Sequence, residues 1–150
     1  MGQTEIEKIK TIIENYRKVK LKFYQFIKLL EAMISEEKLL DIELKNSNDA
    51  GMELLVLDSP VFVKFSLVLS PENVPMGKVD FIKLNEFGDT RYEYIHTLFF
   101  NQLGNILESI SDTFSNRRIN DEHDIPNLIH RFLQKYLQTL RIKETAEDNK

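Results

Sequence analysis

Pro71-Glu-Asn-Val-Pro75-Met-Gly-Lys-Val79-Asp-Phe81 is the stretch that decides the fold. It follows residues 61–69, Val-Phe-Val-Lys-Phe-Ser-Leu-Val-Leu, in which every odd position is apolar and the even positions are mixed. Alternation with a period of two is typical of a strand that is buried on one face. Prolines and a glycine then interrupt the pattern before a further strand is expected at 78–84. The stretch therefore predicts a turn between two neighbouring strands, with Phe65 and Leu67 buried.

Two shorter strands are expected before this pair. Ile42 and Leu44 alternate with polar residues, and residues 52–57 form a second apolar run. The segment between them, 46–51, is Asn-Ser-Asn-Asp-Ala-Gly, so the two runs predict a hairpin. Asp58-Ser-Pro60 predicts another tight turn. The middle of the chain thus predicts a four-stranded antiparallel meander.

Helices are expected after the meander, beyond a loop at 85–89. Residues 91–114 carry apolar side chains at helical spacing, namely Ile95, Leu98, Phe99, Leu103, Ile106, Leu107, Ile110 and Phe114. A polar connector, 115–124, leads to a last helix, for which Asp124 is the expected N-cap and Pro126 lies in the first turn. The expected apolar face of this helix is Leu128, Ile129, Phe132, Tyr136 and Leu140.

The N-terminal segment predicts one long helix. Thr4-Glu-Ile-Glu7 is a capping-box pattern, in which the Thr and Glu side chains each bond an otherwise unpaired backbone N–H group. No glycine or proline follows until after Lys38. Such a helix would be about 50 Å long, at about 1.5 Å per residue, which is more than a domain of this size needs to cover its core.

The apolar residues of this helix follow a heptad pattern over four repeats. The helix seam, as we call the two interleaved rows, comprises Ile6, Ile9, Ile13, Tyr16, Lys20, Phe23, Ile27, Leu30 and Ile34. Rows of this spacing are typical of a coiled coil, and a single lysine within them is tolerated at a cost in stability. Pairing with a second helix, in a homodimer or a heterodimer, is the preferred interpretation. The alternative is that the seam covers the protein's own sheet.

Charge and composition limit the classes of function. From Lys8 to Lys28 the helix has seven basic residues and one acidic residue, whereas the whole chain has a net charge of −4. We interpret this basic stripe as the solvated back of the helix, because no arginine and aromatic platform accompanies it; nucleic acid is not an expected partner. No apolar run approaches the roughly 20 residues that span a bilayer, so a soluble intracellular protein without membrane contact is expected. The chain has no cysteine, which excludes disulfides and thiol nucleophiles.

The proline stretch resembles the corresponding turn of RWD domains, the non-catalytic relatives of ubiquitin-conjugating enzymes. Members of that family tend to carry Pro-Glu-Asn-Tyr-Pro, a spacer with paired prolines and then a Val-x-Phe strand. The matching residues here are Pro71, Glu72, Asn73, Pro75, Val79 and Phe81. Val74 replaces the tyrosine, and the spacer is two residues short and lacks the proline pair. Residues 125–137 are also similar to the last helix of RWD domains.

The resemblance implies an α+β fold with a long N-terminal helix, a four-stranded antiparallel meander and two C-terminal helices. Residues 1–35 would form the coiled-coil-like helix, 36–143 the RWD-like head, and 144–150 a charged tail. An active conjugating enzyme would need a cysteine beyond the fourth strand to accept ubiquitin. Because this chain has none, we expect no enzymatic activity, no catalytic residues and no cofactor. We also expect no metal, since the spacing of His123 and His130 matches no known metal site.

Three functional hypotheses follow. The resemblance to RWD proteins with a preceding coiled coil implies a protein-binding scaffold in a kinetochore or chromosome-segregation complex, located in the nucleus. A monomeric RWD adaptor in translation control or the ubiquitin and SUMO pathways, located in the cytoplasm, is the alternative. The third hypothesis is a small acidic inhibitor of bacterial or phage origin, which resembles the family by chance.

Overall fold

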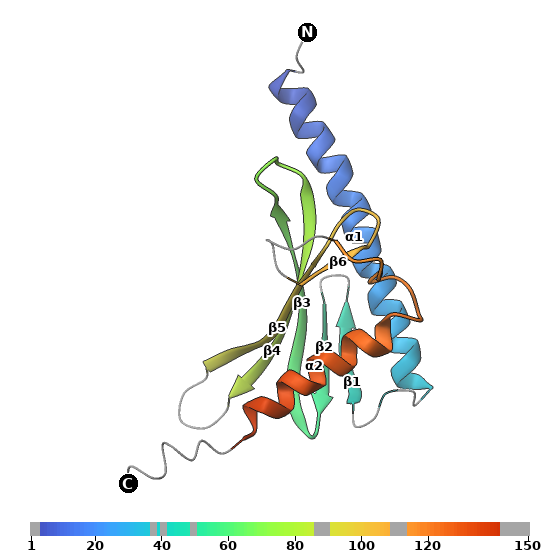
Figure 1. Cartoon of the computed structure of the whole chain (residues 1–150), viewed down its shortest axis with the longest axis vertical. Helices are drawn as coiled ribbons and strands as arrows, with labels where there is room; N and C mark the ends of the chain where they lie inside the picture. The colour runs from blue at the N-terminus through green and yellow to red at the C-terminus, as the bar shows by residue number, and fades with distance from the viewer. Residues whose placement is uncertain are drawn as a thin grey trace.

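The computed structural model describes residues 4–36, 39, 42–48, 51–85, 91–108 and 114–141. They form an α+β fold with a long N-terminal helix, an antiparallel sheet and a C-terminal helix (Figure 1). The elements in chain order are α1 (Glu5–Ser35), β1 (Ile42–Asn48), β2 (Gly51–Val56), β3 (Ser59–Leu69), β4 (Pro75–Asn85), β5 (Arg91–Phe100), β6 (Ile106–Leu107) and α2 (Ile125–Thr139). The expected tail at 144–150, and the expected loop at 85–89 apart from Asn85, lie outside the described residues.

The six strands form a meander in which each strand pairs with the next in sequence. At one edge, β1 pairs with β2 with a register shift between Leu44 and Asn46, so Lys45 lacks a directly opposed residue. Its side chain forms an ion pair with Glu53 of β2 at 3.7 Å. Between β3 and β4 the register is continuous, from Val61 opposite Lys83 to Leu69 opposite Pro75. The long β3–β4 hairpin therefore forms the centre of the sheet.

The proline stretch is the turn of this hairpin, which confirms its predicted place. The backbone N–H of Ser70 donates to the carbonyl of Val74 at 2.9 Å, and the Ser70 hydroxyl accepts from the N–H of Val74 at 3.1 Å. Asn73 has φ 62°, a conformation that asparagine tolerates better than most residues. Pro75 lies at the start of β4, where the missing N–H group costs little.

Both helices pack on the same face of the sheet and share one core. Val63 lies directly opposite Phe81, and Phe65 is on the same face two residues along β3. Phe65 stacks on Phe23 of α1 with 4.9 Å between the ring centroids, whereas Phe81 stacks on Phe132 of α2 at 4.5 Å. The core between this face of the sheet and the two helices is therefore continuous.

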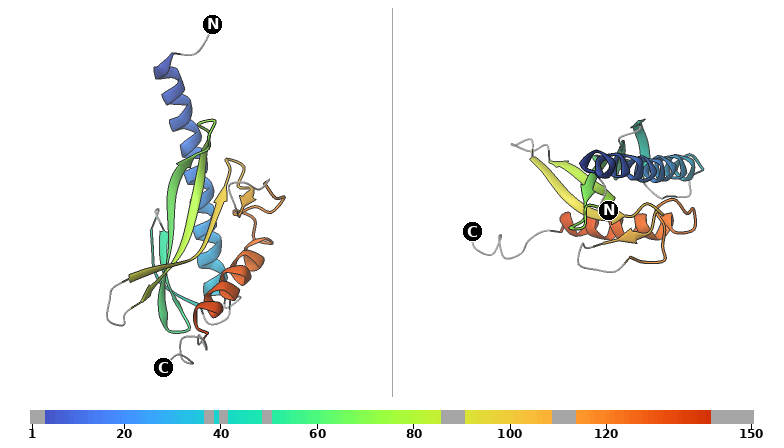
Figure 2. Two further views of the ribbon diagram at one scale, coloured as in Figure 1. Left: turned by 60° about the vertical axis from the view of Figure 1, so that its left-hand side comes forward. Right: turned by 90° about the horizontal axis from the view of Figure 1, so that it is seen from above.

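Helix α1 begins as predicted. The N–H of Glu7 donates to the Thr4 hydroxyl at 3.1 Å, and the N–H of Thr4 donates to the Glu7 carboxylate at 3.3 Å, which completes the capping box. Burial starts only in the middle of the helix, and the buried residues are Val19, Phe23, Phe26, Ile27, Leu30 and Met33. The C-terminal half of α1 thus belongs to the core of the sheet, and the N-terminal half extends past it (Figures 1 and 2).

The predicted helix at 91–114 is wrong, and the sheet has six strands instead of four. Residues 91–100 are β5 and pair with β4, while Ile106 and Leu107 are β6; among the described residues after β6 there is one helix, α2. Gly104, at φ 88°, lies in the turn between β5 and β6. This backbone conformation would be strained for a residue with a side chain. An added Cβ would also lie 2.4 Å from the Asn120 side-chain oxygen. Ile110, also assigned to that helix, lies outside the described residues.

Three smaller predictions also need correction. Leu67 was expected to be buried but is 39% exposed, because β3 continues beyond the part of the sheet that α1 covers; Phe65 is partly buried. Asp124 lies at the N-cap position of α2, yet its carboxylate accepts from the N–H of Arg118 at 2.9 Å instead of capping the helix. The turn after β2 comprises Leu57 and Asp58, both at positive φ, so it begins one residue earlier than predicted.

Candidate functional site

The first half of the helix seam is exposed on the projecting end of α1. Ile6, Ile9 and Ile13 are 67%, 54% and 45% exposed. They lie at intervals of three and four residues and therefore share one face of the helix. Tyr16 ends this exposed group, because its ring lies against Phe65 of β3 with 6.5 Å between the centroids. Three large aliphatic side chains in a row without cover are a candidate contact surface.

The second half of the helix seam is part of the protein's own core. Phe23, Ile27 and Leu30 are buried, and Ile34 is partly buried and packs against the same cluster. Lys20, which lies between the two halves, is exposed. The structure therefore brings the two halves of the predicted seam into different surroundings. Of the apolar members of the helix seam, Ile6, Ile9 and Ile13 are available to another chain.

The residues that carried the family resemblance occupy structural positions. Pro71, Glu72 and Asn73 are exposed in the hairpin turn. Pro75, Val79 and Phe81 are buried in β4, where two of them face the helices. Of the basic stripe, Lys22 is partly buried and the remaining members, Lys8, Lys10, Arg17, Lys18, Lys20 and Lys28, are exposed.

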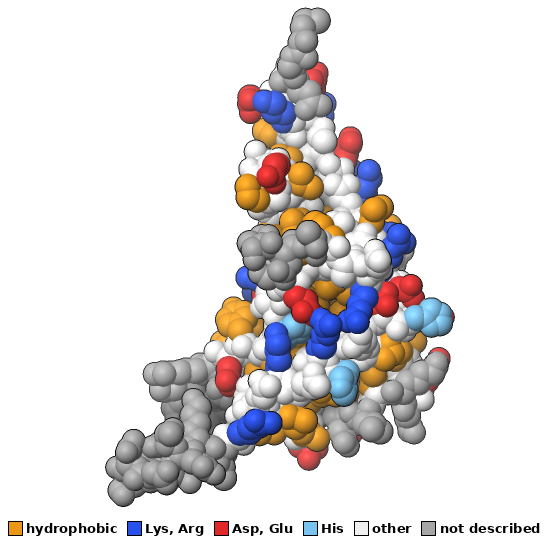
Figure 3. All heavy atoms as spheres, viewed as in Figure 1, with side chains coloured by type: hydrophobic (Ala, Val, Ile, Leu, Met, Phe, Trp, Pro, Cys, Tyr) orange, Lys and Arg blue, Asp and Glu red, His pale blue; other side chains and the backbone are white. Residues whose placement is uncertain are grey.

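A second candidate site was missed by sequence reasoning, and it lies between β5, β6 and α2. A cavity of about 480 Å³ is lined by His96, Leu98, Ile106, Glu108, Ser115, Arg117, Asp124, Leu128 and Arg131. We call it the α2 cavity. In Figure 3, blue and red side chains gather above α2 around hydrophobic atoms that are visible between them.

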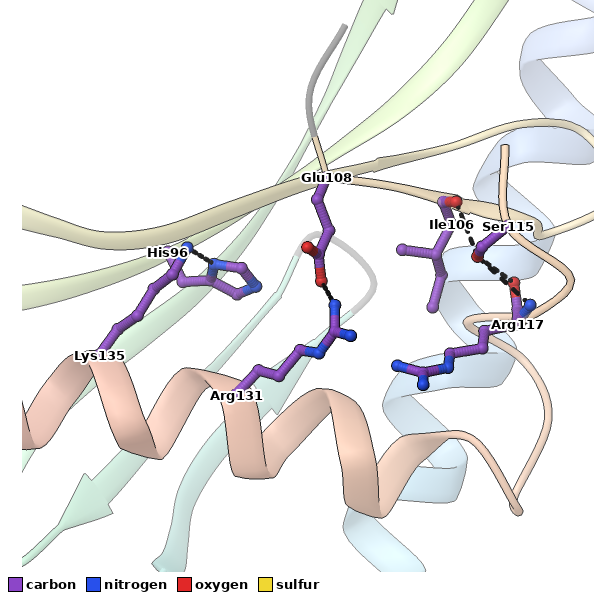
Figure 4. Close-up of polar contacts among 7 residues, drawn as sticks. All are labelled: His96, Ile106, Glu108, Ser115, Arg117, Arg131 and Lys135. Atoms are coloured by element: carbon purple, nitrogen blue, oxygen red, sulfur yellow. Dashed lines mark hydrogen bonds and ion pairs between the residues drawn. The ribbon is translucent and has the colours of Figure 1, made fainter. Parts of the chain in front are cut away.

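His96 lies at the inner wall of the α2 cavity and is 96% buried. Its Nδ1 lies 2.8 Å from the Lys135 ammonium group, and its ring packs on Phe81 with 5.9 Å between centroids. Because an ammonium group can only donate, Nδ1 accepts, and the proton of the neutral ring is on Nε2. Figure 4 shows Nε2 pointing toward the side chains of Glu108 and Arg131.

Burial lowers the pKa of His96 to about 4, and the charge of Lys135 acts in the same direction. Arg131 lowers this pKa further, whereas Glu108 opposes the shift. His96 is therefore neutral at pH 7 and supplies a hydrogen-bond donor without a charge.

The two arginines of the α2 cavity differ in their partners. Arg131 pairs with the carboxylate of Glu108 (Figure 4). With the Asn127 amide assigned so that its oxygen faces Arg117, both terminal nitrogens of Arg117 donate to that oxygen, at 2.7 and 3.0 Å. The Ser115 hydroxyl donates to the carbonyl of Ile106 at 3.0 Å, which ties the connector to β6. Within the described residues, Arg117 has no carboxylate partner.

The signal that could have revealed this site is the composition of β5. Its sequence, Arg-Tyr-Glu-Tyr-Ile-His-Thr-Leu-Phe-Phe, is rich in aromatic and β-branched residues, which favour strands over helices. Assignment of β5 as a strand would have placed His96 beside Phe81 and toward the last helix. The composition of β5 does not reveal that the connector residues Ser115, Arg117 and Asp124 line the cavity. Their positions depend on the path of an irregular segment.

Comparison with models of known protein families, with curated proteins and with solved structures finds no match to this chain. The resemblance to RWD domains thus stays a prediction, and the observed order of elements differs from the implied one over residues 91–108. No helix in the described ranges is long and apolar enough to cross a bilayer. Among the same residues, no three His, Cys, Asp or Glu side chains lie where they could hold one metal ion.

Protonation of His96 should make the fold sensitive to mild acid. The unfolded chain gains a proton on this residue as the pH falls through about 6.5, whereas the folded chain gains it only near pH 4. The free energy of unfolding should therefore fall as the pH decreases between these values. Urea unfolding at pH 7, 6, 5 and 4.5 should show a steeper decrease for the natural chain than for His96→Gln.

The matched control for this prediction is His130→Gln, because His130 is a histidine of α2 that is exposed. This variant should keep the pH dependence of the natural chain. An identical pH dependence in the His96→Gln variant would show that His96 has an ordinary pKa in the folded protein.

Proposed function

We propose that the chain is a non-catalytic protein-interaction scaffold that forms a homodimer through the exposed half of the helix seam. The observation that supports this proposal is the exposure of Ile6, Ile9 and Ile13 on a helix that extends past its own sheet (Figure 2). Burial of one such side chain contributes about 1.5 to 3 kcal/mol. We call Ile6, Ile9 and Ile13 the exposed row. Two copies of this row would provide six isoleucines for a shared interface.

The charges next to the exposed row favour a parallel pair of helices. In the heptad frame, Ile6 and Ile13 are at position a, so Glu5 is at position g and Lys10 and Arg17 are at position e. In a parallel coiled coil, position g of one helix faces position e of the next heptad in the other. Glu5 of one copy would then face Lys10 of the second copy. In an antiparallel pair, Lys10 and Arg17 would face the same basic residues and repel them.

The exposed row spans two heptads, so the helices alone would form a short interface. Lys20 at the next a position would place two ammonium groups together and end the seam. Each copy carries a sheet and α2, so a dimer presents two identical heads. Two heads bind a repeated or dimeric partner more strongly than one, because the second contact is intramolecular. A chromosome-segregation partner is implied by the family resemblance alone.

A monomeric adaptor is the second candidate function. The observation that favours it is that α1 packs on its own sheet from Val19 onward, which leaves less of the helix seam free. In this case the partner protein, rather than a second copy, would cover the exposed row. The same substitutions in that row distinguish the two candidates.

Replacing both Ile9 and Ile13 by glutamate should convert the dimer into a folded monomer. Both side chains are exposed in the single chain, so their replacement leaves the core intact, whereas four carboxylates would repel one another at the interface. Light scattering after size exclusion at about 100 μM would measure the mass, and circular dichroism would check the fold.

Thr11→Glu is the matched control, because Thr11 is exposed on the opposite side of α1 and the variant also gains a carboxylate. This variant should remain dimeric. A natural chain that is monomeric at the protein concentration of this measurement would exclude the homodimer and favour the adaptor. A double variant that stays dimeric would place the interface elsewhere.

A further inference from the structure

We propose that the α2 cavity is a binding site for a small organic carboxylate with an apolar body. The inference is independent of the dimer and rests on how this cavity is built. Its floor is apolar and consists of Leu98 of β5, Ile106 of β6 and Leu128 of α2, all buried in the fold. The polar side chains of the cavity include His96, Glu108, Arg117 and Arg131, which lie between the strands and α2 (Figure 4). An apolar floor with a few polar groups is typical of small-molecule sites.

The polar groups of the cavity favour an anion. Arg117 enters from the connector and Arg131 from α2, and Lys135 lies one helical turn beyond Arg131. Arg117 and Lys135 have no carboxylate partner within the described residues, and Arg117 retains its full charge while bonding the neutral amide of Asn127. The Nε2 hydrogen of His96 provides a neutral donor at the inner wall. Charge-assisted hydrogen bonds to guanidinium groups are the strongest contacts that proteins make to carboxylates.

The carboxylate of Glu108 is the group that now satisfies Arg131. Both side chains of this pair are more than 40% exposed, so the pair contributes little to stability and can separate at low cost. The same three residues, His96, Glu108 and Arg131, also line a neighbouring hollow of about 360 Å³ that extends toward Lys135 and Gln138. Glu108 therefore competes with the ligand for Arg131. Its removal should strengthen binding.

The size and polarity of the cavity limit the ligand. A volume of about 480 Å³ is within the range for small-molecule sites, about 300 to 1,000 Å³. Asp124 also lines the cavity, which disfavours ligands with several negative charges, such as polyphosphates. A single carboxylate bonded to Arg131 and His96, with a hydrocarbon part on the floor, fits the balance of charges.

The test uses hexanoate as the probe, with hexanol and inorganic phosphate as comparison compounds. Each is titrated into the full natural chain at pH 7 and constant ionic strength, and binding is followed by amide and methyl chemical shifts in NMR spectra. Hexanoate should shift signals of His96, Leu98, Ile106 and Leu128 with saturation. Hexanol, which has the same carbon chain without the charge, should bind at least about tenfold more weakly, because it lacks the charge-assisted bonds.

Three variants make the test specific. Arg131→Gln should weaken hexanoate binding about tenfold or more, whereas Glu108→Gln should strengthen it severalfold. Lys64→Gln is the control, because Lys64 is an exposed cation of β3 that does not line the α2 cavity, and it should leave binding unchanged. Thermal unfolding of each variant checks that the fold is retained.

Several results would overturn the proposal. These are no saturable shift in the cavity, equal affinity for hexanol and hexanoate, and unchanged hexanoate binding in a folded Arg131→Gln variant. Tighter binding of phosphate than of hexanoate at the same residues would also overturn it, because the site would then recognise charge without the apolar body.

Discussion

Replacing Phe23 by glutamate should leave the chain without its tertiary fold at 25 °C. Phe23 is fully buried in the middle of α1 and lies 4.9 Å from Phe65 and 5.9 Å from Phe26, measured between ring centroids. Loss of a buried phenylalanine costs about 3 to 5 kcal/mol. Burial of a carboxylate without a partner adds several kcal/mol more, so the total is comparable with the whole stability of a domain, about 5 to 15 kcal/mol.

The matched control is Ile13→Glu, which adds the same charge ten residues earlier on the same helix. Ile13 is 45% exposed, so its carboxylate remains in water and the fold should persist. Near-ultraviolet circular dichroism and urea unfolding would compare the two variants. A cooperative unfolding transition in Phe23→Glu would mean that α1 does not cover the sheet in solution.

Replacing Phe81 by alanine should reduce the free energy of unfolding by about 4 kcal/mol. The ring is fully buried between Phe132 of α2, at 4.5 Å, and His96 of β5, at 5.9 Å, measured between centroids. Its removal leaves a cavity at the junction of the sheet and α2, where the fully buried Val79 and Tyr136 restrict collapse. Urea midpoints compared at an unchanged m-value would measure the difference.

Tyr92→Ala is the control for this prediction, because Tyr92 is an aromatic residue of the adjacent strand that is 63% exposed. Its ring contacts Phe62 edge-on at 6.4 Å, so the variant should lose less than about 1 kcal/mol. Equal losses in the two variants would contradict the assignment of the core face of β4.

Local sequence signals were sufficient to predict the start of α1 and the β3–β4 hairpin. The capping box at Thr4 and Glu7 needs only residues three apart, and its two hydrogen bonds form as predicted. The alternation in 61–69 and the proline turn likewise determine β3, β4 and their hairpin. These signals are strong because each position is decided by its nearest neighbours along the chain.

The error at 91–107 has a different physical origin. Apolar residues are so dense there that the same positions fit a period of 3.6 as well as a period of two. Ile95, Leu98 and Phe99 mark one face of a hypothetical helix. In β5, Ile95, Leu98 and Phe100 belong to the core cluster, whereas Phe99 is only partly buried. Pairing with β4 decides that this segment forms a strand instead of a helix. Such pairing is a tertiary interaction, which the apolar pattern alone does not predict.

The candidate sites were predictable to different degrees. All members of the helix seam were named from the heptad pattern, but the pattern is the same in both halves and cannot tell that Phe23 is covered while Ile9 is exposed. That difference depends on where the sheet ends. The α2 cavity combines His96, Arg117 and Arg131 from three separate segments. Their proximity follows from the docking of α2, for which the sequence has no local signal.

The register shift at Lys45 has a consequence for aggregation. An edge strand with a regular row of free N–H and C=O groups is a template on which strands of other molecules can add. In β1 the regular row is interrupted at Lys45, and the charged side chain lies beside Glu53. The β1 edge is therefore a poor starting point for fibril growth, although the chain has long apolar strands in its centre. At the opposite edge β6 pairs, among the described residues, with Phe99 and Phe100, so this two-residue strand does not cover the rest of β5.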